Sequence, residues 1–194
     1  KKFGGQVLMT SPQHTCGTER CLEAFRIINQ ENKYTTEDVI INIQGDEPLI
    51  NPEQIDLVAS CFKSSKVEIA TLVRKLDNQD DLISPNVIKV VCDNYKKAMY
   101  FSRSPIPYFR GLEQEQWLKK HTYFQHIGIY AYSTEALKQL MQLPPSSVEK
   151  AESLEQLRWL ENGFEIHVEF TNHPSHSVDV PADVENIIRL LKQN

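Results

Sequence analysis

The sequence predicts an α/β fold with a mixed, mainly parallel sheet, and three observations lead to this prediction. Residues 38–43 form an almost unbroken β-branched run, which is typical of a strand buried in a parallel sheet. A loop and a helix start follow at 44–54, which makes half of a β-α-β unit. Strand-like and helix-like segments then alternate to residue 192. The 194 residues contain no internal repeat or linker, so we expect one domain over 1–194.

The N-terminal half begins with a short strand and two helices. Residues 6–9 are strand-like, and 18–30 place apolar side chains on one helical face. A second helix starts at Asn51, which can act as the N-cap. Pro52 fits the first helical turn, and Gln54 can close a capping box.

The remaining elements are predicted from the spacing of apolar residues and from the turn residues that separate the segments. We expect strands at 69–73, 87–92, 98–101, 126–132 and 166–170, and helices at 134–142, 153–161 and 181–192. The turn at 93–96 makes 87–92 and 98–101 a β-hairpin, and Asn162-Gly163 ends the second of these helices.

Composition narrows the class of protein. The net charge of −5 argues against a general nucleic-acid binder, which would show a basic surplus. No run approaches the ~20 apolar residues of a membrane span, and no signal peptide is visible. The four cysteines form no C-x-x-C pair, so we expect free thiols in a reducing compartment and a cytoplasmic protein.

Two aspartates lie in turns that lead into helices. Asp46 follows the strand 38–43 in Gln-Gly-Asp-Glu-Pro, at the strand end where open α/β sheets place ligands. A carboxylate there suits Mg²⁺ that bridges nucleotide phosphates, although a purely structural turn is the alternative. Asp179 could be a second Mg²⁺ ligand if the two turns meet, or only a helix cap.

Polar groups elsewhere suit an anionic sugar or a nucleotide. The glycine turn at 15–20 opens a helix, whose backbone N–H groups can bind an anion or a base edge. Arg103, in a Pro-punctuated loop, suits bidentate capture of a carboxylate. His126 and Tyr130 project from one face of a strand, with Gly128 open between them. Each of these features also has an ordinary structural reading, as a capped helix, a surface arginine or satisfied core side chains.

Taken in order along the chain, these segments resemble the 3-deoxy-manno-octulosonate (Kdo) cytidylyltransferases. The matching segments are Met9-Thr10-Ser11, Gly17-Thr18-Glu19-Arg20, Val39 through Pro48, Asn86 through Val91, Ala98 through Pro107, His126 through Tyr130, Leu154 through Arg158, and Val178-Asp179. The combination spans nearly the whole chain and is much more specific than any one piece.

The resemblance implies a single Rossmann-like, GT-A-like nucleotidyltransferase domain that joins CTP and Kdo to CMP-Kdo and pyrophosphate for lipopolysaccharide synthesis. It implies a Mg²⁺-dependent cytoplasmic homodimer, with the β-hairpin as a dimerisation subregion. By position, Asp46 and Asp179 resemble the Mg²⁺ ligands, and Gly17, Thr18 and Arg20 part of the cytidine pocket. The sugar-acid pocket would comprise Gln44, Arg103, His126, Tyr130, Glu155 and Gln156, with Asp46, Asp179 and Arg103 as the catalytic set.

The chain departs from the family pattern at its start. Such proteins open with a basic loop resembling I-P-A-R-x-x-S-x-R-L-P-G-K-P that holds the CTP phosphates, and no such run occurs here. We therefore expect an N-terminally truncated chain, with little activity on its own. The remaining alternatives are a cytidylyltransferase for another acid sugar such as sialic acid, or a non-catalytic sugar-binding or dimerisation fragment.

Overall fold

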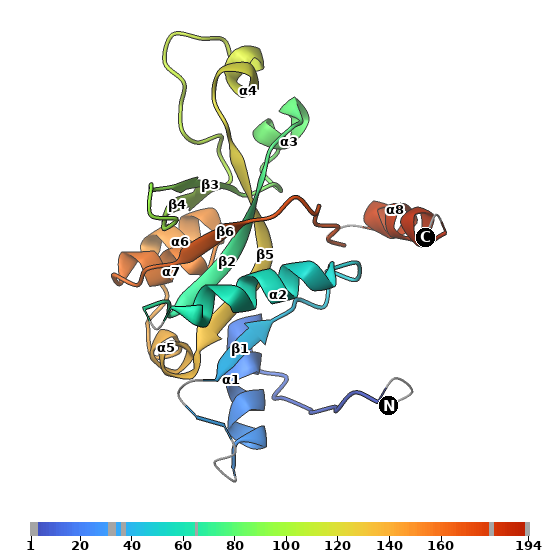
Figure 1. The fold of residues 1–194 in the computed structure, drawn as a ribbon, viewed down its shortest axis with the longest axis vertical. Coiled ribbons are helices and arrows are strands. Elements are labelled where there is room, and N and C mark those ends of the chain that lie inside the picture. Colours follow the sequence, from blue (N-terminus) through green and yellow to red (C-terminus); the bar gives the residue numbers. More distant parts are fainter. Residues whose placement is uncertain (1–3, 31–33, 36–37, 65, 179–180, 193–194) are drawn as a thin grey trace.

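One six-stranded sheet organises the part of the chain that the structure describes (Figure 1). The computed structural model describes residues 4–30, 34–35, 38–64, 66–178 and 181–192. The strands are β1 (Val39–Asn42), β2 (Ile69–Lys75), β3 (Lys89–Cys92), β4 (Ala98–Ser102), β5 (Phe124–Ser133) and β6 (His167–Phe170). The strand order is β4-β3-β5-β2-β6, and β1 also pairs with β5.

The prediction of a mainly parallel sheet is wrong. Among the described strands only β2 and β6 pair in parallel, whereas β5 runs antiparallel to β1, β2 and β3, and β3 to β4. The β-branched run at 38–43 reports a strand but carries no information about the direction of its neighbour. That strand, β1, is only half-buried, and it pairs with β5 at the end of β5 that β3 does not reach.

Two strands therefore share one edge of β5. β1 pairs with residues 130–133 of β5, and β3 pairs with 124–125. The His126 N–H donates to the Ile88 carbonyl oxygen at 2.8 Å, just before β3 begins. Between these pairings lies a stretch of β5 around Gly128 where the end of β1 and the start of β3 face each other, and the candidate site lies there.

Helices cover both faces of the sheet. The helices are α1 (Gly17–Ile28), α2 (Pro52–Ser60), α3 (Gln79–Ile83), α4 (Trp117–Lys120), α5 (Thr134–Leu140), α6 (Ser147–Glu152), α7 (Gln156–Glu161) and α8 (Pro181–Leu191), with short 3₁₀ turns η1 (Cys61–Lys63) and η2 (Gln114–Gln116). Along β2, Ile69 and Val73 pack into the core formed with α1, α5 and α7. Ala70 and Leu72 pack on the other side against α2, as expected for side chains that alternate along a strand.

Most predicted elements are confirmed, including the capping box of α2 and the hairpin of β3 and β4. The predicted strand at 6–9 is wrong, because these residues are extended but pair with no described strand, and Met9 is 86% exposed. The predicted helix at 153–161 begins only at Gln156, and α6 precedes it. Ser153 has a φ of 52°, a left-handed conformation that ends α6 and separates the two helices.

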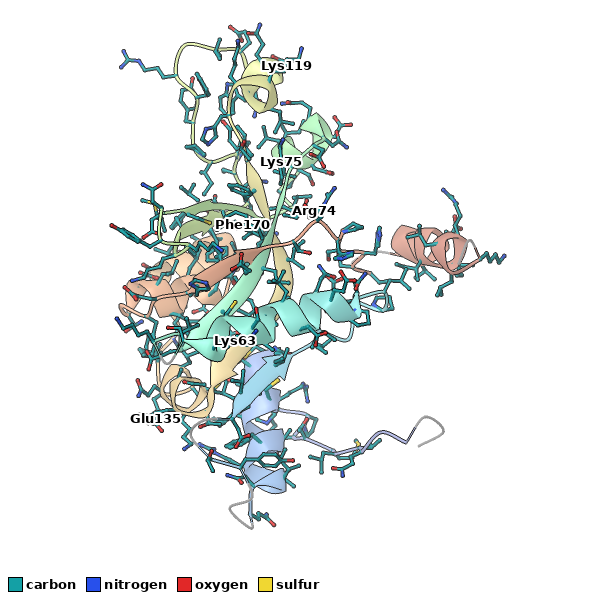
Figure 2. All side chains as sticks on the ribbon, viewed as in Figure 1. Lys63, Arg74, Lys75, Lys119, Glu135 and Phe170 are labelled. Carbon is teal, nitrogen blue, oxygen red and sulfur yellow. The ribbon has the colours of Figure 1, made fainter. Side chains whose placement is uncertain are left out.

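The ends of the sheet are closed by smaller clusters. A third core cluster lies beyond the upper end of β2 and β5, where Leu82 of α3 packs with Trp117 of α4 and Tyr123. Phe170 ends β6 (Figure 2). Its ring lies 5.0 Å from that of Phe124, centroid to centroid. α8 lies to one side of the body, and in the described residues no helix has the length and apolar character to cross a membrane (Figure 1).

Candidate active site

A large cleft of about 1370 Å³ opens where β1 ends beside the middle of β5. Every predicted site residue that the structure describes lines it, namely Gly17, Thr18, Arg20, Gln44, Asp46, Arg103, His126, Tyr130, Glu155 and Gln156. Asp179 lies outside the described residues. Residues up to 139 positions apart in sequence therefore meet in one hollow, and the cleft forms at the carboxyl end of β1, as expected.

An irregularity in β5 brings His126 and Tyr130 together. Residues four apart in a regular strand are separated by ~13 Å, yet these two rings lie 5.1 Å apart, centroid to centroid. The register between β2 and β5 shifts at Thr71, so that Thr71 pairs with Tyr130 and Leu72 with Ile127. The two extra residues on β5 form a bulge, which aims both rings into the cleft.

Thr71 holds this bulge, and the sequence analysis did not single it out. Its buried hydroxyl donates to the Ile129 carbonyl oxygen at 2.7 Å, and the His126 Nε2 atom lies 2.9 Å from the same hydroxyl oxygen. Because a hydroxyl has one proton, the Thr71 oxygen must accept from His126 Nε2–H. Burial lowers the pKa of His126 to about 3, so the ring is neutral. Its Nδ1 atom is then a hydrogen-bond acceptor.

Gln44 extends from the end of β1 across the bulge. Its Nε2 atom donates to the Gly128 carbonyl oxygen at 2.9 Å, which supplies the partner that a polar residue at this strand end requires. A Cβ at residue 128 would lie only 3.3 Å from that nitrogen and 3.8 Å from a Glu47 carboxylate oxygen. Glycine at 128 therefore lets Gln44 and Glu47 approach the strand closely, and the Gln44 side chain covers the opening that the sequence predicted.

The Asp46 turn contacts the segment that leads toward Asp179. The Val178 N–H donates to the Asp46 carbonyl oxygen at 2.9 Å, and the Ser175 hydroxyl donates to the Glu47 carboxylate. Asp46 itself is exposed in the cleft. The exposed carboxylate of Asp46 suits Mg²⁺, which takes one or two protein carboxylates together with phosphate oxygens and water.

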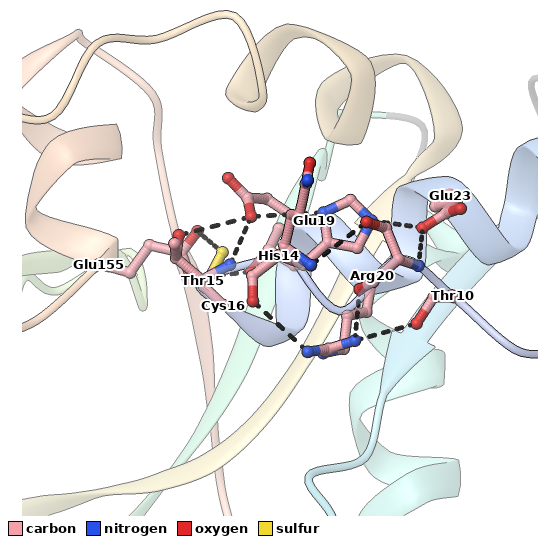
Figure 3. A network of polar contacts seen from close by, with 11 residues as sticks. Thr10, His14, Thr15, Cys16, Glu19, Arg20, Glu23 and Glu155 are labelled. Carbon is pink, nitrogen blue, oxygen red and sulfur yellow. Dashed lines mark hydrogen bonds and ion pairs between the residues drawn. The ribbon is translucent and has the colours of Figure 1, made fainter.

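Glu155 connects the predicted nucleotide and sugar residues. Its carboxylate accepts from the Thr18 hydroxyl at 2.9 Å and from the Cys16 thiol at 3.2 Å (Figure 3). Burial raises the pKa of Glu155, and these two hydrogen bonds oppose the rise. Burial also raises the pKa of Cys16, to about 11, so this thiol is a neutral donor. The start of α1 and the loop before α7 thus form one continuous wall.

Arg20 orders the segment before α1. Its guanidinium donates to the Thr10 hydroxyl at 3.1 Å and to the carbonyl oxygens of Ser11 and His14 at 3.0 and 3.4 Å (Figure 3). Arg20 lines the cleft, but its guanidinium uses several N–H donors in these hydrogen bonds to the segment before α1. This residue therefore shapes the mouth of the cleft.

Arg103 is held almost entirely by main-chain carbonyls. Its Nε donates to Glu152 O at 2.6 Å, its Nη1 to Pro85 O at 2.9 Å and its Nη2 to Ser153 O at 3.3 Å. The Arg103 backbone N–H donates to the Glu152 carboxylate at 2.9 Å. Three of its five side-chain N–H groups are used in this way, which fixes the guanidinium and leaves two donors for a ligand.

Of the three buried side-chain donors left unsatisfied in the described residues, two belong to residues that line the cleft, and the third is Tyr132 Oη. Tyr130 Oη and Trp159 Nε1 have no hydrogen-bond partner in the part of the chain that the structure describes, and their rings meet edge to face at 5.1 Å. Burial raises the pKa of Tyr130 well above its usual value, so the phenol stays protonated. Unpaired buried donors are costly, and both of these lie on residues of the cleft lining. Trp159 lines the cleft but was not among the predicted residues, because a tryptophan on a helix is normally a core residue.

A second group of metal-ligand type lies outside this cleft. Cys61, His167 and Glu169 bring ligand atoms within 4.8 Å of one another beside a separate hollow of about 740 Å³. Both Glu169 carboxylate oxygens accept from the Lys96 ammonium at 2.8 Å. That ammonium already neutralises the carboxylate that a cation would need.

Comparison with known proteins places the chain in a family. The cytidylyltransferase family matches residues 1–167. The 3-deoxy-manno-octulosonate cytidylyltransferase of Parabacteroides distasonis is 50% identical over 98% of this chain and 76% of its own. The corresponding protein of Bacteroides thetaiotaomicron is 47% identical over 99% of this chain and 76% of its own. This chain therefore spans about three quarters of the length of these relatives.

Solved structures give the same result at the level of the fold. A CMP:2-keto-3-deoxy-manno-octonic acid synthetase solved with CTP superposes with a TM-score of 0.84 and 36% identity, over 99% of this chain and 74% of that one. A putative glucose-1-phosphate thymidylyltransferase from Bacillus anthracis superposes with a TM-score of 0.52 at 13% identity, over 89% of this chain and 61% of that one. The latter likeness shows the fold alone.

Proposed function

This chain belongs to the 3-deoxy-manno-octulosonate cytidylyltransferase family, and we propose that its cleft transfers CMP from CTP to Kdo with Mg²⁺ at the Asp46 turn. The observation that carries the assignment is the convergence of ten predicted residues, from five separate segments, on one hollow. In the reaction, the anomeric hydroxyl oxygen of Kdo bonds to the α-phosphorus of CTP, and the bond from that phosphorus to pyrophosphate breaks. The hydroxyl proton is released.

Different residues of the cleft bind the sugar acid and the nucleotide. Arg103 offers its two remaining N–H donors to the sugar carboxylate. His126 Nδ1 can accept from a sugar hydroxyl, and Tyr130 Oη can donate to one. The start of α1, with Gly17 and Thr18, presents backbone N–H groups to the nucleotide. Positioning of the two substrates is then the main contribution of the protein.

Asp46 and Asp179 are the proposed Mg²⁺ ligands. The approach of Val178 to the Asp46 carbonyl supports this pairing, since Asp179 follows Val178 directly. Mg²⁺ bound at these carboxylates would offset the negative charge of the α-phosphate and the leaving pyrophosphate. Asp46, Asp179 and Arg103 then form the catalytic set.

The first prediction tests the metal role of Asp46. Asp46→Asn should lower kcat at least 100-fold, because an amide is a much weaker Mg²⁺ ligand, while the melting temperature stays unchanged since Asp46 is exposed. Pyrophosphate release from CTP and Kdo, titrated with Mg²⁺ in a polypeptide that includes the family's phosphate loop, measures it. Asp56→Asn, at an exposed position on α2, is the matched control. Near-normal turnover in Asp46→Asn would remove the metal-ligand role.

The same assay separates the candidate substrates. Release with sialic acid but not with Kdo would contradict the Kdo assignment. Sugar binding without release would indicate a non-catalytic binding fragment.

We also propose a cytoplasmic homodimer that uses the β3–β4 hairpin. The hairpin presents Met99, 62% exposed, and Tyr95, 80% exposed, next to the half-exposed Tyr100. Apolar groups gathered on one hairpin suit a protein interface. All four cysteines are free thiols, which suits a reducing compartment.

A further inference from the structure

Lys89, the first residue of β3, is completely buried, and its ammonium is bound only by main-chain carbonyls. Its Nζ donates to Ser84 O at 2.7 Å, to Val87 O at 2.6 Å and to Arg103 O at 2.5 Å. An ammonium has three N–H groups, and these three carbonyls use all of them. The lysine is therefore fully satisfied in one geometry.

These hydrogen bonds join the two loops that form one end of the cleft. Ser84 caps the end of α3, and the loop from there to Val87 leads into β3. Asn86, Val87 and Arg103 all line the cleft. The Arg103 guanidinium also donates to Pro85 O, so the same short loop gives carbonyls to both cations.

Charge makes this arrangement more than a packing feature. Glu152 is the carboxylate beside the two cations, but it accepts from the Ser102 hydroxyl at 2.6 Å and the Arg103 backbone N–H, not from Lys89. Lys89 and Arg103 thus place two positive charges beside the single Glu152 carboxylate, and Asp81 and Arg74 are further charged residues of the lining. A fully buried lysine costs free energy that an apolar side chain would not, so a fold that needed only packing here would not require it.

We propose that Lys89 is the positioning residue for the sugar carboxylate, because its hydrogen bonds fix the Arg103 loop and its ammonium adds a positive charge beside the Arg103 guanidinium. This inference rests on the proposed function, in which Arg103 binds the carboxylate of Kdo. Lys89 does not touch the substrate. It acts through the Arg103 carbonyl and through the loop at 84–87.

The test is the affinity for Kdo of Lys89→Met, which keeps the length of the side chain and removes its charge and donors. We expect calorimetry to show at least a 10-fold increase in the Kd for Kdo, with the KM for CTP changed less than twofold. Leu137→Ala is the matched control, because Leu137 is fully buried in α5, which contributes no residue to the described lining. That variant should lower the melting temperature without changing the Kd for Kdo.

A pH titration of the wild type gives a second measure that does not require the variant to fold. Burial lowers the pKa of Lys89 to about 8, with nearby Glu152 opposing the shift and Arg103 adding to it. Above that pH a neutral amine has two N–H groups for three carbonyls. The Kd for Kdo should therefore rise between pH 7 and 9.5, while Leu137→Ala shows the same profile as wild type.

The outcomes are distinct. A Kd for Lys89→Met within twofold of wild type, or a flat wild-type profile from pH 7 to 9.5, would overturn the role of Lys89 and leave the proposed function standing. Absence of Kdo binding to the wild type would overturn the proposed function and this inference together.

Discussion

At the scale of single residues, the chemistry of His126 is decided by a threonine 55 positions earlier. The Thr71 hydroxyl donates to Ile129 O and accepts from His126, so it holds the bulge of β5 and sets which imidazole nitrogen is unprotonated. The low pKa of His126, caused by burial, removes the cationic form from the working range. A neutral ring with an acceptor at Nδ1 can bind a sugar hydroxyl, whereas a cation could not accept that bond.

Thr71→Val should therefore raise the Kd for Kdo about 5- to 20-fold, which corresponds to the loss of about one or two kcal/mol of hydrogen bonding. Valine keeps the shape and removes the hydroxyl, and Thr71→Ser should restore most of the affinity. Nitrogen-15 NMR of the imidazole would show mixed tautomers in Thr71→Val. Thr171→Val, at another buried threonine outside the cleft lining, should leave the His126 spectrum unchanged, and an unchanged spectrum in Thr71→Val would contradict the tautomer role.

At the scale of elements, the start of α2 anchors the segment that approaches Asp46. The Asn51 side chain accepts from Glu53 N as an N-cap, and its Nδ2 lies 3.0 Å from His173 Nδ1. The other nitrogen of His173 lies 2.8 Å from the Glu53 carboxylate, and Gln54 reaches the His173 carbonyl at 3.5 Å. The N-terminus of α2 therefore stabilises its own first turn and also holds His173, which lies five residues before Val178.

Asn51→Ala should lower the free energy of unfolding by about 1–2 kcal/mol, at the upper end of the usual cost of a lost N-cap. It should also raise the Mg²⁺ concentration needed for half-maximal activity, because the Val178 segment loses an anchor. Denaturant unfolding and Mg²⁺ titration measure the two effects. Asn78→Ala is the control. It also removes an N-cap, that of α3, but the Asn78 side chain bonds to Asp80 N and not to His173. An equal Mg²⁺ response in both variants would show that the cap acts on stability alone.

At the scale of the whole molecule, the strands that pair with β5 determine where the site lies. β2 covers one edge of this strand along most of its length, and β1 and β3 share the other edge. The interval between these two strands, with its bulge, is where the cleft opens. The turn of the β3–β4 hairpin lies against β6, where the Val168 N–H donates to Lys96 O at 2.8 Å. Tyr95 and Met99 of this hairpin are exposed, and they form the surface proposed for dimer formation.

Met99→Glu should convert the proposed homodimer to a monomer, because a charged side chain would be desolvated at the interface. Sedimentation velocity measures the change in mass. Met9→Glu alters an even more exposed methionine on the N-terminal segment and should leave the assembly intact. A dimer that persists in Met99→Glu would show that the interface does not include the hairpin.

Local signals in the sequence determined most elements and most of the lining of the cleft. The cap at Asn51, the turn at 93–96 and the β-branched run at 38–43 act through neighbouring residues, so they can be read along the chain. Asp46 was predictable because a polar turn after such a strand marks a ligand site in α/β folds. Arg103 was predictable because a guanidinium in a rigid loop suits a carboxylate, whereas Glu155 and Gln156 were assigned to the sugar pocket through resemblance to a family.

The tertiary structure alone decided the direction of the strands, the bulge of β5 and the parts played by Thr71, Lys89 and Trp159. Strand direction depends on the path of the connections, and a β-branched run reads the same in either direction. The two hydrogen-bonded side chains are satisfied by carbonyls that lie beside them only after folding, up to 58 positions away for Thr71. Burial of a hydroxyl or an ammonium costs free energy until those partners arrive, so its role is a property of the folded contacts.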